Sequence, residues 1–319
     1  MFFRTFRKFH GGQLKVWDYF NHVLASPAFT PRIGFSPRSN WDHTNPWLNA
    51  RDYVVDSWRS VRPDVFFVAG RDWRMLDEHP AAAADIPVVN LVQHVRHANE
   101  ESTRFEFLQR KAIRVCVSEE VATALRETRL ARGPLIVIPN GLDLDDLPGH
   151  DERAPGVDAL VVALKQPELG EELGRRLRRP GRSVDVLATR LPRPNFLARL
   201  RGARTTVFLP NRTEGFYLPA LEGMALGTIV VCPDCVGNRS FCLPGHNAFR
   251  PDYALEEVVG AAESALTLPT ERAEELRANA RQTAEAHSLH RERKAFLDVL
   301  DDVDRLWRSA RDDGAGGRG

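Results

Sequence analysis

The feature that most constrains the fold is a series of short apolar runs separated by stretches of helical periodicity. The runs lie at 2–6, 32–35, 64–70, 86–93, 113–118 and 135–141 in the first half, and at 158–164, 184–188, 205–210 and 228–232 in the second. Short, near-continuous apolar runs are typical of parallel strands that are covered on both faces. We therefore expect an α/β protein with doubly wound sheets.

Helices are expected between these strands. An apolar pattern at helical spacing starts at Leu14 and stops before Pro27, and Ser118 is a suitable cap for a helix over 119–129. Further helices are predicted at 167–179, 194–202 and 217–226. A helical segment from about 271 to 310 has its apolar residues on one face, at Leu289, Phe296, Leu300, Val303 and Trp307.

A chain of 319 residues exceeds the usual size of one core, so two domains are expected. The polar, Pro/Gly-rich stretch 141–156 is interpreted as a linker. The predicted division is an N-terminal Rossmann-like domain at 1–145, a C-terminal Rossmann-like domain at 146–285, a C-terminal helix at 286–310 that packs back toward the N-terminal domain, and a disordered tail at 311–319.

Composition excludes several classes of function. A net charge of +1 gives no reason to expect nucleic acid as a partner, and no apolar run is long enough to span a bilayer. Basic residues interrupt the phenylalanines of the N-terminus, so no signal peptide is expected. Four cysteines favour a reducing cytoplasm. Peripheral association of the segment 1–9 with the inner face of the membrane is the alternative to a first strand there.

The stretch "NRTEGFYLPALEGMALG" from Asn211 follows an apolar run and enters a predicted helix. A helix N-terminus at the carboxyl end of a parallel strand is a natural phosphate site. Glu222, about one turn into the helix, and Glu214, on the turn before it, are each able to accept hydrogen bonds from the diol of a ribose or sugar. The alternative is a solvated Glu214 and a Glu222 placed near the helix dipole.

This stretch resembles the donor-binding signature of the family-4 retaining glycosyltransferases of the GT-B fold. Their pattern is P-S-x-x-E-G-F-G-L-P-x-L-E-A-M-A-x-G, followed by an apolar strand and a G-G/N-x-x-E turn. Here it reads "PNRTEGFYLPALEGMALG" and then "TIVVCPDCVGNRSF". "HGGQ", "VCVSEEVATAL" and "VIPNGLDLDDL" agree in order. The resemblance implies two Rossmann-like domains facing across a cleft and a hexosyltransferase-type enzyme that uses a nucleotide-diphospho-sugar.

The resemblance also implies roles for single residues. Catalytic roles fall on His94 beside the transferred sugar, Glu214 at a sugar hydroxyl and Lys165 at the diphosphate. Glu222 would bind the ribose, and Gly11 and Gly12 would form a loop over the phosphates and the acceptor. The remaining donor-binding residues would be Gly215, Phe216, Tyr217, Leu218, Asn238 and Arg239.

The sequence departs from the family pattern in four ways. Position 159 is alanine where the family usually has an arginine six or so residues before the lysine, and Arg190, Arg193 or Arg239 is the candidate substitute. Tyr217 replaces a glycine, which indicates an unusual sugar pocket. Ser240 replaces an acid. The second domain is short, and one strand–helix unit of the usual pattern is absent.

The cysteines leave two interpretations. Cys232, Cys235 and Cys242 with His246 provide zinc-type ligands, but their spacing matches no known knuckle, and packing of buried thiols is favoured. No cofactor and no catalytic metal are expected, because no D-x-D triplet lies at a strand end. The acidic cluster at 143–146 lies in the linker and is interpreted as solvated.

The leading hypothesis is a retaining glycosyltransferase that moves a sugar from a nucleotide-diphospho-sugar to a small-molecule, lipid or glycan acceptor. A catalytically inactive nucleotide-sugar-binding partner of another transferase is the alternative, and a phosphorylase or hydrolase of sugar phosphates is a third. For acceptor contacts the sequence suggests the aromatic, aperiodic segment 36–49, with Trp41, His43 and Trp47. The oligomeric state has no sequence signal.

Overall fold

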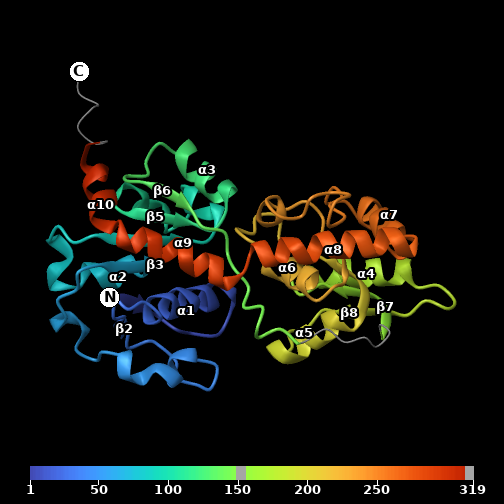
Figure 1. Cartoon of the computed structure of the whole chain (residues 1–319), viewed down its shortest axis with the longest axis horizontal. Coiled ribbons are helices and arrows are strands. Elements are labelled where there is room, and N and C mark those ends of the chain that lie inside the picture. The colour runs from blue at the N-terminus through green and yellow to red at the C-terminus, as the bar shows by residue number, and fades with distance from the viewer. Residues whose placement is uncertain (149–155, 313–319) are drawn as a thin grey trace. The chain divides into compact units, whose positions relative to one another are not determined.

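The computed structural model describes residues 1–148 and 156–312, which form two compact units (Figure 1). One unit comprises Met1–Asn140 and the segment that begins at Glu292, and the other comprises Gly141–Arg291. Residues 149–155 of the predicted linker and 313–319 of the predicted disordered tail lie outside the described residues. Residues 311 and 312 were expected in that tail and instead end a helix. No helix in the described part of the chain is long and apolar enough to cross a membrane.

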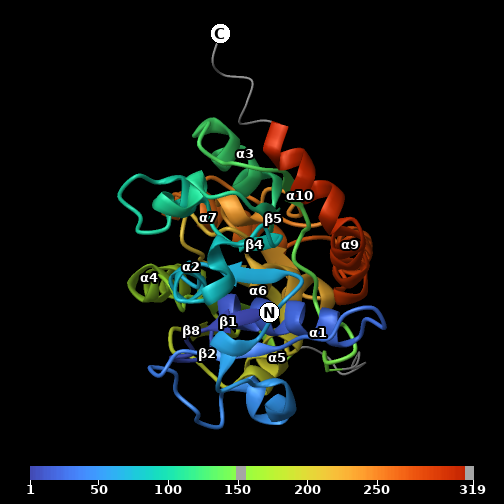
Figure 2. The same cartoon turned by 90° about the vertical axis from the view of Figure 1, so that its left-hand side faces the viewer.

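The first unit is built on a parallel sheet whose described strands have the order β2-β1-β3-β4-β5-β6 (Figure 2). Its strands are β1 (Phe2–Arg4), β2 (Ile33–Phe35), β3 (Phe66–Ala69), β4 (Val88–Val92), β5 (Ile113–Cys116) and β6 (Leu135–Val137). Its α-helices are α1 (Gly11–Leu24), α2 (Trp73–Asp77), α3 (Glu119–Glu127), α9 (Leu289–Asp301) and α10 (Val303–Asp312). Short 3₁₀ helices are η1 (Pro46–Tyr53), η2 (Trp58–Ser60), η3 (Pro80–Ala83), η4 (Val95–Ala98) and η5 (Phe105–Gln109).

Each predicted apolar run contains one strand, and Ser118 caps α3 as expected by accepting a hydrogen bond from the Val121 N–H at 3.3 Å. The start of α1 differs from the prediction. Gly11 and Gly12 lie in the first turn of this helix, not in a loop before it. The reason is that the His10 side chain caps the helix, and its Nδ1 accepts a hydrogen bond from the Gly12 N–H at 3.2 Å.

The C-terminal helical segment is divided at Asp302 into α9 and α10, where a single helix was expected. The Asp302 carboxylate accepts hydrogen bonds from the Arg305 Nε, at 2.8 Å through Oδ1 and at 2.9 Å through Oδ2, at the start of α10. The predicted apolar face is buried, and Phe296 has no exposed surface. A buried ion pair reinforces this packing: the Lys15 Nζ of α1 lies 2.5 Å from the Glu292 Oε2 of α9.

The segment 36–49 does not form an aromatic surface. Trp47 is fully buried, with its ring centroid 5.2 Å from that of Trp17 and 5.5 Å from that of Phe35. The predicted acceptor role of Trp47 is therefore wrong, because an indole with no exposed surface belongs to the core. Trp41 packs 4.5 Å from Phe35 and lies under the Arg51 guanidinium. The third predicted contact, His43, is exposed.

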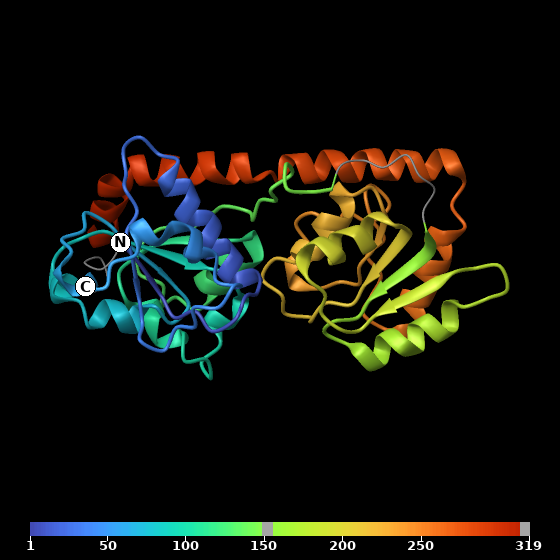
Figure 3. The same cartoon turned by 90° about the horizontal axis from the view of Figure 1, so that it is seen from below.

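The second unit is a smaller parallel sheet of order β10-β9-β7-β8, with helices on both faces (Figure 3). Its strands are β7 (Val157–Val162), β8 (Val184–Leu187), β9 (Ala203–Phe208) and β10 (Ile229–Val231). Its helices are α4 (Pro167–Leu177), α5 (Arg193–Arg201), α6 (Leu218–Ala225), η6 (Val236–Asn238), α7 (Leu255–Leu266) and α8 (Thr270–Ala286).

Successive side chains of β9 point to opposite faces of the sheet, and different helices cover the two faces. Val207 packs in one apolar cluster with Leu173 of α4 and Val258 of α7. Phe208, the next residue, points to the other face. There its ring lies against Gly223 of α6, where an added Cβ would be 3.0 Å from the Phe208 Cζ. The sheet is therefore covered on both sides, as the apolar runs predicted. The loops at the carboxyl ends of β7 and β9 are left at one edge.

Candidate functional site

The carboxyl edge of the second sheet holds two of the predicted catalytic side chains. Lys165 follows β7 and Glu214 follows β9, and these strands are direct neighbours in the sheet. The Lys165 Nζ lies 3.5 Å from the Glu214 Oε1, with 39% of the lysine side chain exposed and 18% of the carboxylate. The pair is thus partly open to solvent and able to receive a ligand.

Asn211 orients Glu214. Its backbone N–H and its Nδ2 donate to the Glu214 Oε1 at 3.4 and 3.1 Å. Both contacts, like the contact with Lys165, involve the same carboxylate oxygen. Among the described residues no partner occurs at the second oxygen, Oε2, which leaves an acceptor for a ligand hydroxyl.

Glu222 lies in α6 and is only 3% exposed. Its Oε1 accepts a hydrogen bond from the Arg193 Nη1 at 2.5 Å. Arg193, at the start of α5, also lies 3.9 Å from Asp146, an exposed member of the acidic cluster at 143–146. A buried carboxylate needs such a partner. Arg193, one candidate substitute for the missing arginine, thus has Glu222 as a partner.

The loop that carries Glu214 is fixed from behind by Gly237 of η6. The Tyr217 N–H donates to the Gly237 carbonyl at 2.8 Å. A Cβ at position 237 would lie 2.9 Å from both the Glu214 carbonyl oxygen and the Phe216 nitrogen. The two backbone segments therefore approach as closely as glycine permits.

Tyr217 does not reach into an open pocket. It is 5% exposed, and its ring makes an edge contact with Phe208, with the centroids 6.0 Å apart. Burial raises the pKa of its hydroxyl well above the usual value. That Tyr217 in place of glycine makes the sugar pocket unusual stays a prediction, and the buried ring shows no direct contact that would produce it. Its side chain packs in the core, and Leu218 begins α6 directly after it.

Asn238 and the cysteines form the interior of the next turn. The Asn238 Nδ2 donates to the Cys232 Sγ at 3.1 Å and to the Pro233 carbonyl at 3.0 Å, and its Oδ1 accepts from the Cys235 N–H at 3.2 Å. Asn238 has no exposed surface, so its amide shapes the turn and is not presented to a donor. Burial raises the pKa of the Cys232 thiol and keeps it protonated.

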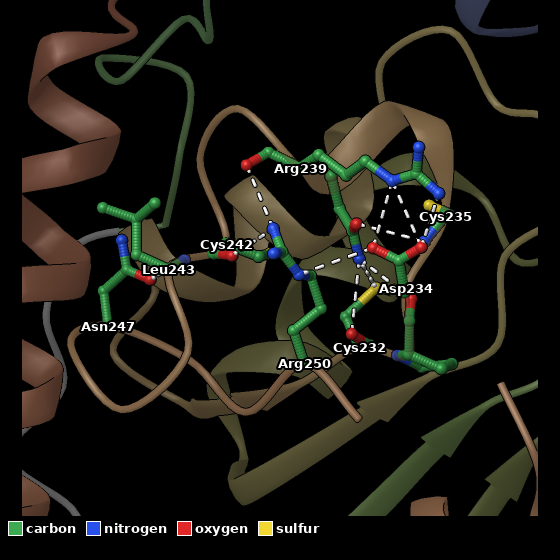
Figure 4. Close-up of polar contacts among 10 residues, drawn as sticks. Cys232, Asp234, Cys235, Arg239, Cys242, Leu243, Asn247 and Arg250 are labelled. Carbon is green, nitrogen blue, oxygen red and sulfur yellow. Dashed lines mark hydrogen bonds and ion pairs between the residues drawn. The ribbon is translucent and has the colours of Figure 1, made fainter. Parts of the chain in front are cut away.

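The predicted donor contact Arg239 lies beside this turn (Figure 4). Its guanidinium Nη2 is 2.6 Å from the Asp234 Oδ2, and Arg250 approaches the same carboxylate at 3.5 Å. His246, by contrast, contacts Asn279. In the part of the chain that the structure describes, no group of three or more His, Cys, Asp or Glu side chains is arranged to hold a metal ion.

The carboxyl edge of the first sheet gathers the predicted residues of that unit. Gln93, directly after β4, donates from its Nε2 to the Gly12 carbonyl at 3.2 Å. This hydrogen bond holds the start of α1 near the end of β4, where His94 follows Gln93 in the chain. His94 caps η4, and its Nδ1 accepts a hydrogen bond from the Arg96 N–H at 3.0 Å. Neutral His94 therefore carries its proton on Nε2.

His97 makes stability depend on pH. It is 5% exposed, and its pKa is lowered to about 3, first by burial and then by the charges of Arg104, Arg96, His94 and Arg114. A histidine whose folded pKa is depressed contributes stability above its unfolded pKa of about 6.5, and this is lost as pH falls toward about 3. We expect a loss of about 2 kcal/mol between pH 7 and 5.

Urea unfolding at pH 7 and 5 measures this effect. His97→Gln should reduce the difference between the two pH values by about 2 kcal/mol. The exposed His43→Gln should leave the difference unchanged. An identical pH dependence in wild type and His97→Gln would show that His97 is not responsible.

The sequence did not predict the two residues that hydrogen-bond the site carboxylates: Arg193 at Glu222 and Asn211 at Glu214. Arg193 was one of three candidates for the diphosphate, and its hydrogen bond to Glu222 was not predicted. Asn211 was predicted only as part of a turn. For Asn211 a signal existed, because an asparagine three residues before a glutamate at a strand end is placed to hydrogen-bond it. The pairing of Arg193 joins residues 29 positions apart and has no local signal.

These two parallel α/β units define the GT-B class of fold. No family model matches the chain, and no curated protein matches it. Solved structures do. Sucrose-phosphate synthase from Thermosynechococcus elongatus is similar at a TM-score of 0.70 and 12% identity, covering 95% of this chain and 98% of that one. HepE from Anabaena, in complex with UDP and glucose, is similar at a TM-score of 0.71 and 14% identity, covering 94% of this chain and 98% of that one. A glycosyltransferase from Rickettsia africae is similar at a TM-score of 0.66 and 14% identity, covering 95% of this chain and 98% of that one.

Proposed function

We propose that the chain is a retaining glycosyltransferase that uses a nucleotide-diphospho-sugar. The observation that carries this proposal is the group at the carboxyl edge of the second sheet, where Lys165 and Glu214 lie 3.5 Å apart and Glu222 is buried in the helix that follows. A cation, an exposed carboxylate oxygen and a second carboxylate provide complementary partners for a diphosphate, a sugar hydroxyl and a ribose. HepE, of the same fold, has been solved with UDP-glucose.

Each side chain has a distinct part in donor binding. The Glu222 Oε2 accepts from the ribose hydroxyls while its Oε1 keeps Arg193, so the ribose contact is charge-assisted. The Glu214 Oε2 accepts from a hydroxyl of the sugar, because Asn211 and Lys165 occupy Oε1. Lys165 lies beside the diphosphate.

The proposed transfer retains the configuration of the anomeric carbon. The bond between the anomeric carbon and the diphosphate oxygen breaks, and the acceptor oxygen bonds to the same face of that carbon. The acceptor proton passes to the departing phosphate. Lys165 stabilises the negative charge that develops on the leaving group. The reaction requires no cofactor, so EDTA treatment should leave activity unchanged.

A thermal-shift screen with nucleotide sugars tests the proposal, with UDP-glucose as the first compound. We expect a rise in the unfolding temperature with one donor class and loss of this rise in Glu222→Gln, which removes the buried charge that binds the ribose. Glu274→Gln is the control, because Glu274 is exposed and pairs only with Arg277 among the described residues. If no nucleotide sugar stabilises the protein, or if Glu222→Gln responds like wild type, the proposal fails.

An inactive nucleotide-sugar-binding protein is the second candidate. The observation in its favour is that Ala159 occupies the place of the family's arginine and that Arg193, one candidate substitute, pairs with Glu222. Release of nucleotide from the stabilising donor distinguishes the two. Slow hydrolysis or transfer supports the enzyme, and stabilisation without any turnover supports the binding protein.

A further inference from the structure

Tyr253, in the segment that leads to α7, makes two hydrogen bonds with the loop that carries Glu214. Its hydroxyl donates to the Pro210 carbonyl at 2.5 Å, and its own carbonyl accepts from the Arg212 Nη2 at 2.6 Å. The Arg212 guanidinium also lies over the Tyr253 ring, 4.6 Å from its centroid. The residues on either side of Asn211 are therefore both attached to one tyrosine.

The attached part of the loop is exposed at Asn211 and Arg212. An exposed loop with few buried contacts opens readily unless other segments hold it. Asn211 is the residue whose backbone N–H and Nδ2 hydrogen-bond the Glu214 Oε1. A movement of the chain at Pro210 or Arg212 therefore moves both of these donors, and the position of the carboxylate changes with them. The contacts made by Tyr253 thus reach Glu214 through Asn211.

The segment that contains Tyr253 is itself anchored to the turn after β10. The Asp234 N–H donates to the Pro251 carbonyl at 2.8 Å, and the Val236 N–H donates to the Arg212 carbonyl at 3.0 Å. Burial raises the pKa of the Tyr253 hydroxyl above its usual value, so the hydroxyl keeps the proton that it donates. Three segments that are distant in sequence are thereby joined at Tyr253.

We propose that Tyr253 is a positioning residue of the transfer reaction, which acts through Asn211 on Glu214. This inference rests on the proposed function for the role of Glu214 at the sugar hydroxyl. Tyr253 holds the chain at Pro210 and Arg212, so that the carboxylate keeps the position from which it accepts the hydrogen bond of the sugar.

A double-mutant cycle tests this inference. Tyr253→Phe removes the hydroxyl and keeps the ring beneath Arg212. We expect kcat to fall about tenfold, because small misplacements of a reacting group slow the chemical step. KM for the donor should change less than kcat. In the Glu214→Gln background the same substitution should lower kcat by less than about twofold, since the carboxylate through which Tyr253 acts is already lost.

Two kinetic outcomes would overturn the inference. One is an unchanged kcat in Tyr253→Phe. The other is a loss by the same factor in both backgrounds, which would show a general structural effect. Tyr53→Phe is the matched control, because Tyr53 is half-buried and has a guanidinium, that of Arg32, 5.8 Å from its ring centroid. This control should keep the wild-type kcat, and a fall equal to that of Tyr253→Phe would also overturn the inference.

Hydrogen exchange without substrate separates this inference from the proposed function. In Tyr253→Phe, the backbone N–H groups of Asn211, Glu214 and Val236, which are hydrogen-bonded within or to the loop, should exchange at least about fivefold faster. The amides of β9 should keep their wild-type rates. Unchanged exchange at the three loop positions overturns the inference whether or not a donor is found. Faster exchange in a protein that no nucleotide sugar stabilises would show that Tyr253 holds the loop and that the proposed function is the part that fails.

Discussion

Glu214→Gln is expected to lower kcat by about 10²- to 10³-fold, the range found when one preorganised group that acts on the transition state is lost. The substitution preserves shape but removes the charge beside Lys165 and weakens the acceptor offered to the sugar hydroxyl. Because 18% of this side chain is exposed and its contacts lie at the surface of the sheet edge, folding should be little affected.

Steady-state kinetics with the donor found by the thermal screen measures this prediction. KM for the donor should change less than kcat, since the substitution leaves the proposed ribose contact at Glu222 unchanged. Glu274→Gln provides the charge-matched control on a helix surface. Retention of more than a tenth of wild-type kcat in Glu214→Gln would contradict a role for this carboxylate in the reaction.

The second large effect is expected from Gly237→Ala. The added methyl group would lie 2.9 Å from two backbone atoms of the Glu214–Phe216 loop, so either the loop or η6 must shift. Overpacking of this kind costs about 1–3 kcal/mol of stability. Displacement of the loop moves Glu214 away from Lys165, and we expect a reduction of kcat/KM by about 100-fold, as small misplacements of reacting groups cause.

Gly260→Ala is the matched control for this variant. Gly260 lies in α7, and nothing lies within 4 Å of an added Cβ, so alanine should be neutral or should stabilise the helix by about 0.5–1 kcal/mol. Urea unfolding and donor kinetics are measured for both. If Gly237→Ala behaves like Gly260→Ala, the close backbone approach does not position the donor loop.

The sequence was sufficient for the strands because buried parallel strands need continuous apolar runs, and every strand lies in or overlaps such a run. It was also sufficient for the position of Glu214 and Lys165 at one edge, since both follow neighbouring strands. It was insufficient for Tyr217 and Trp47, which were assigned to ligands. An aromatic residue has the same pattern in a pocket and in a core, and only tertiary packing separates the two.

The same limit applies to charged residues. The pair Arg193–Glu222 joins residues 29 positions apart, and the pair Lys15–Glu292 joins residues 277 positions apart. Neither pair has a local spacing from which it could be predicted.

The buried Lys15–Glu292 pair has a consequence for how the protein can be divided. The first unit is not a continuous stretch of sequence, because the chain leaves it at Asn140 and rejoins it at Glu292. The second unit is in effect an insertion in the first. A fragment that ends before α9 would lack part of the first unit's own interior, including Phe296, and would leave the Lys15 ammonium without its carboxylate. Residues 141–291 of the second unit, by contrast, are contiguous in sequence.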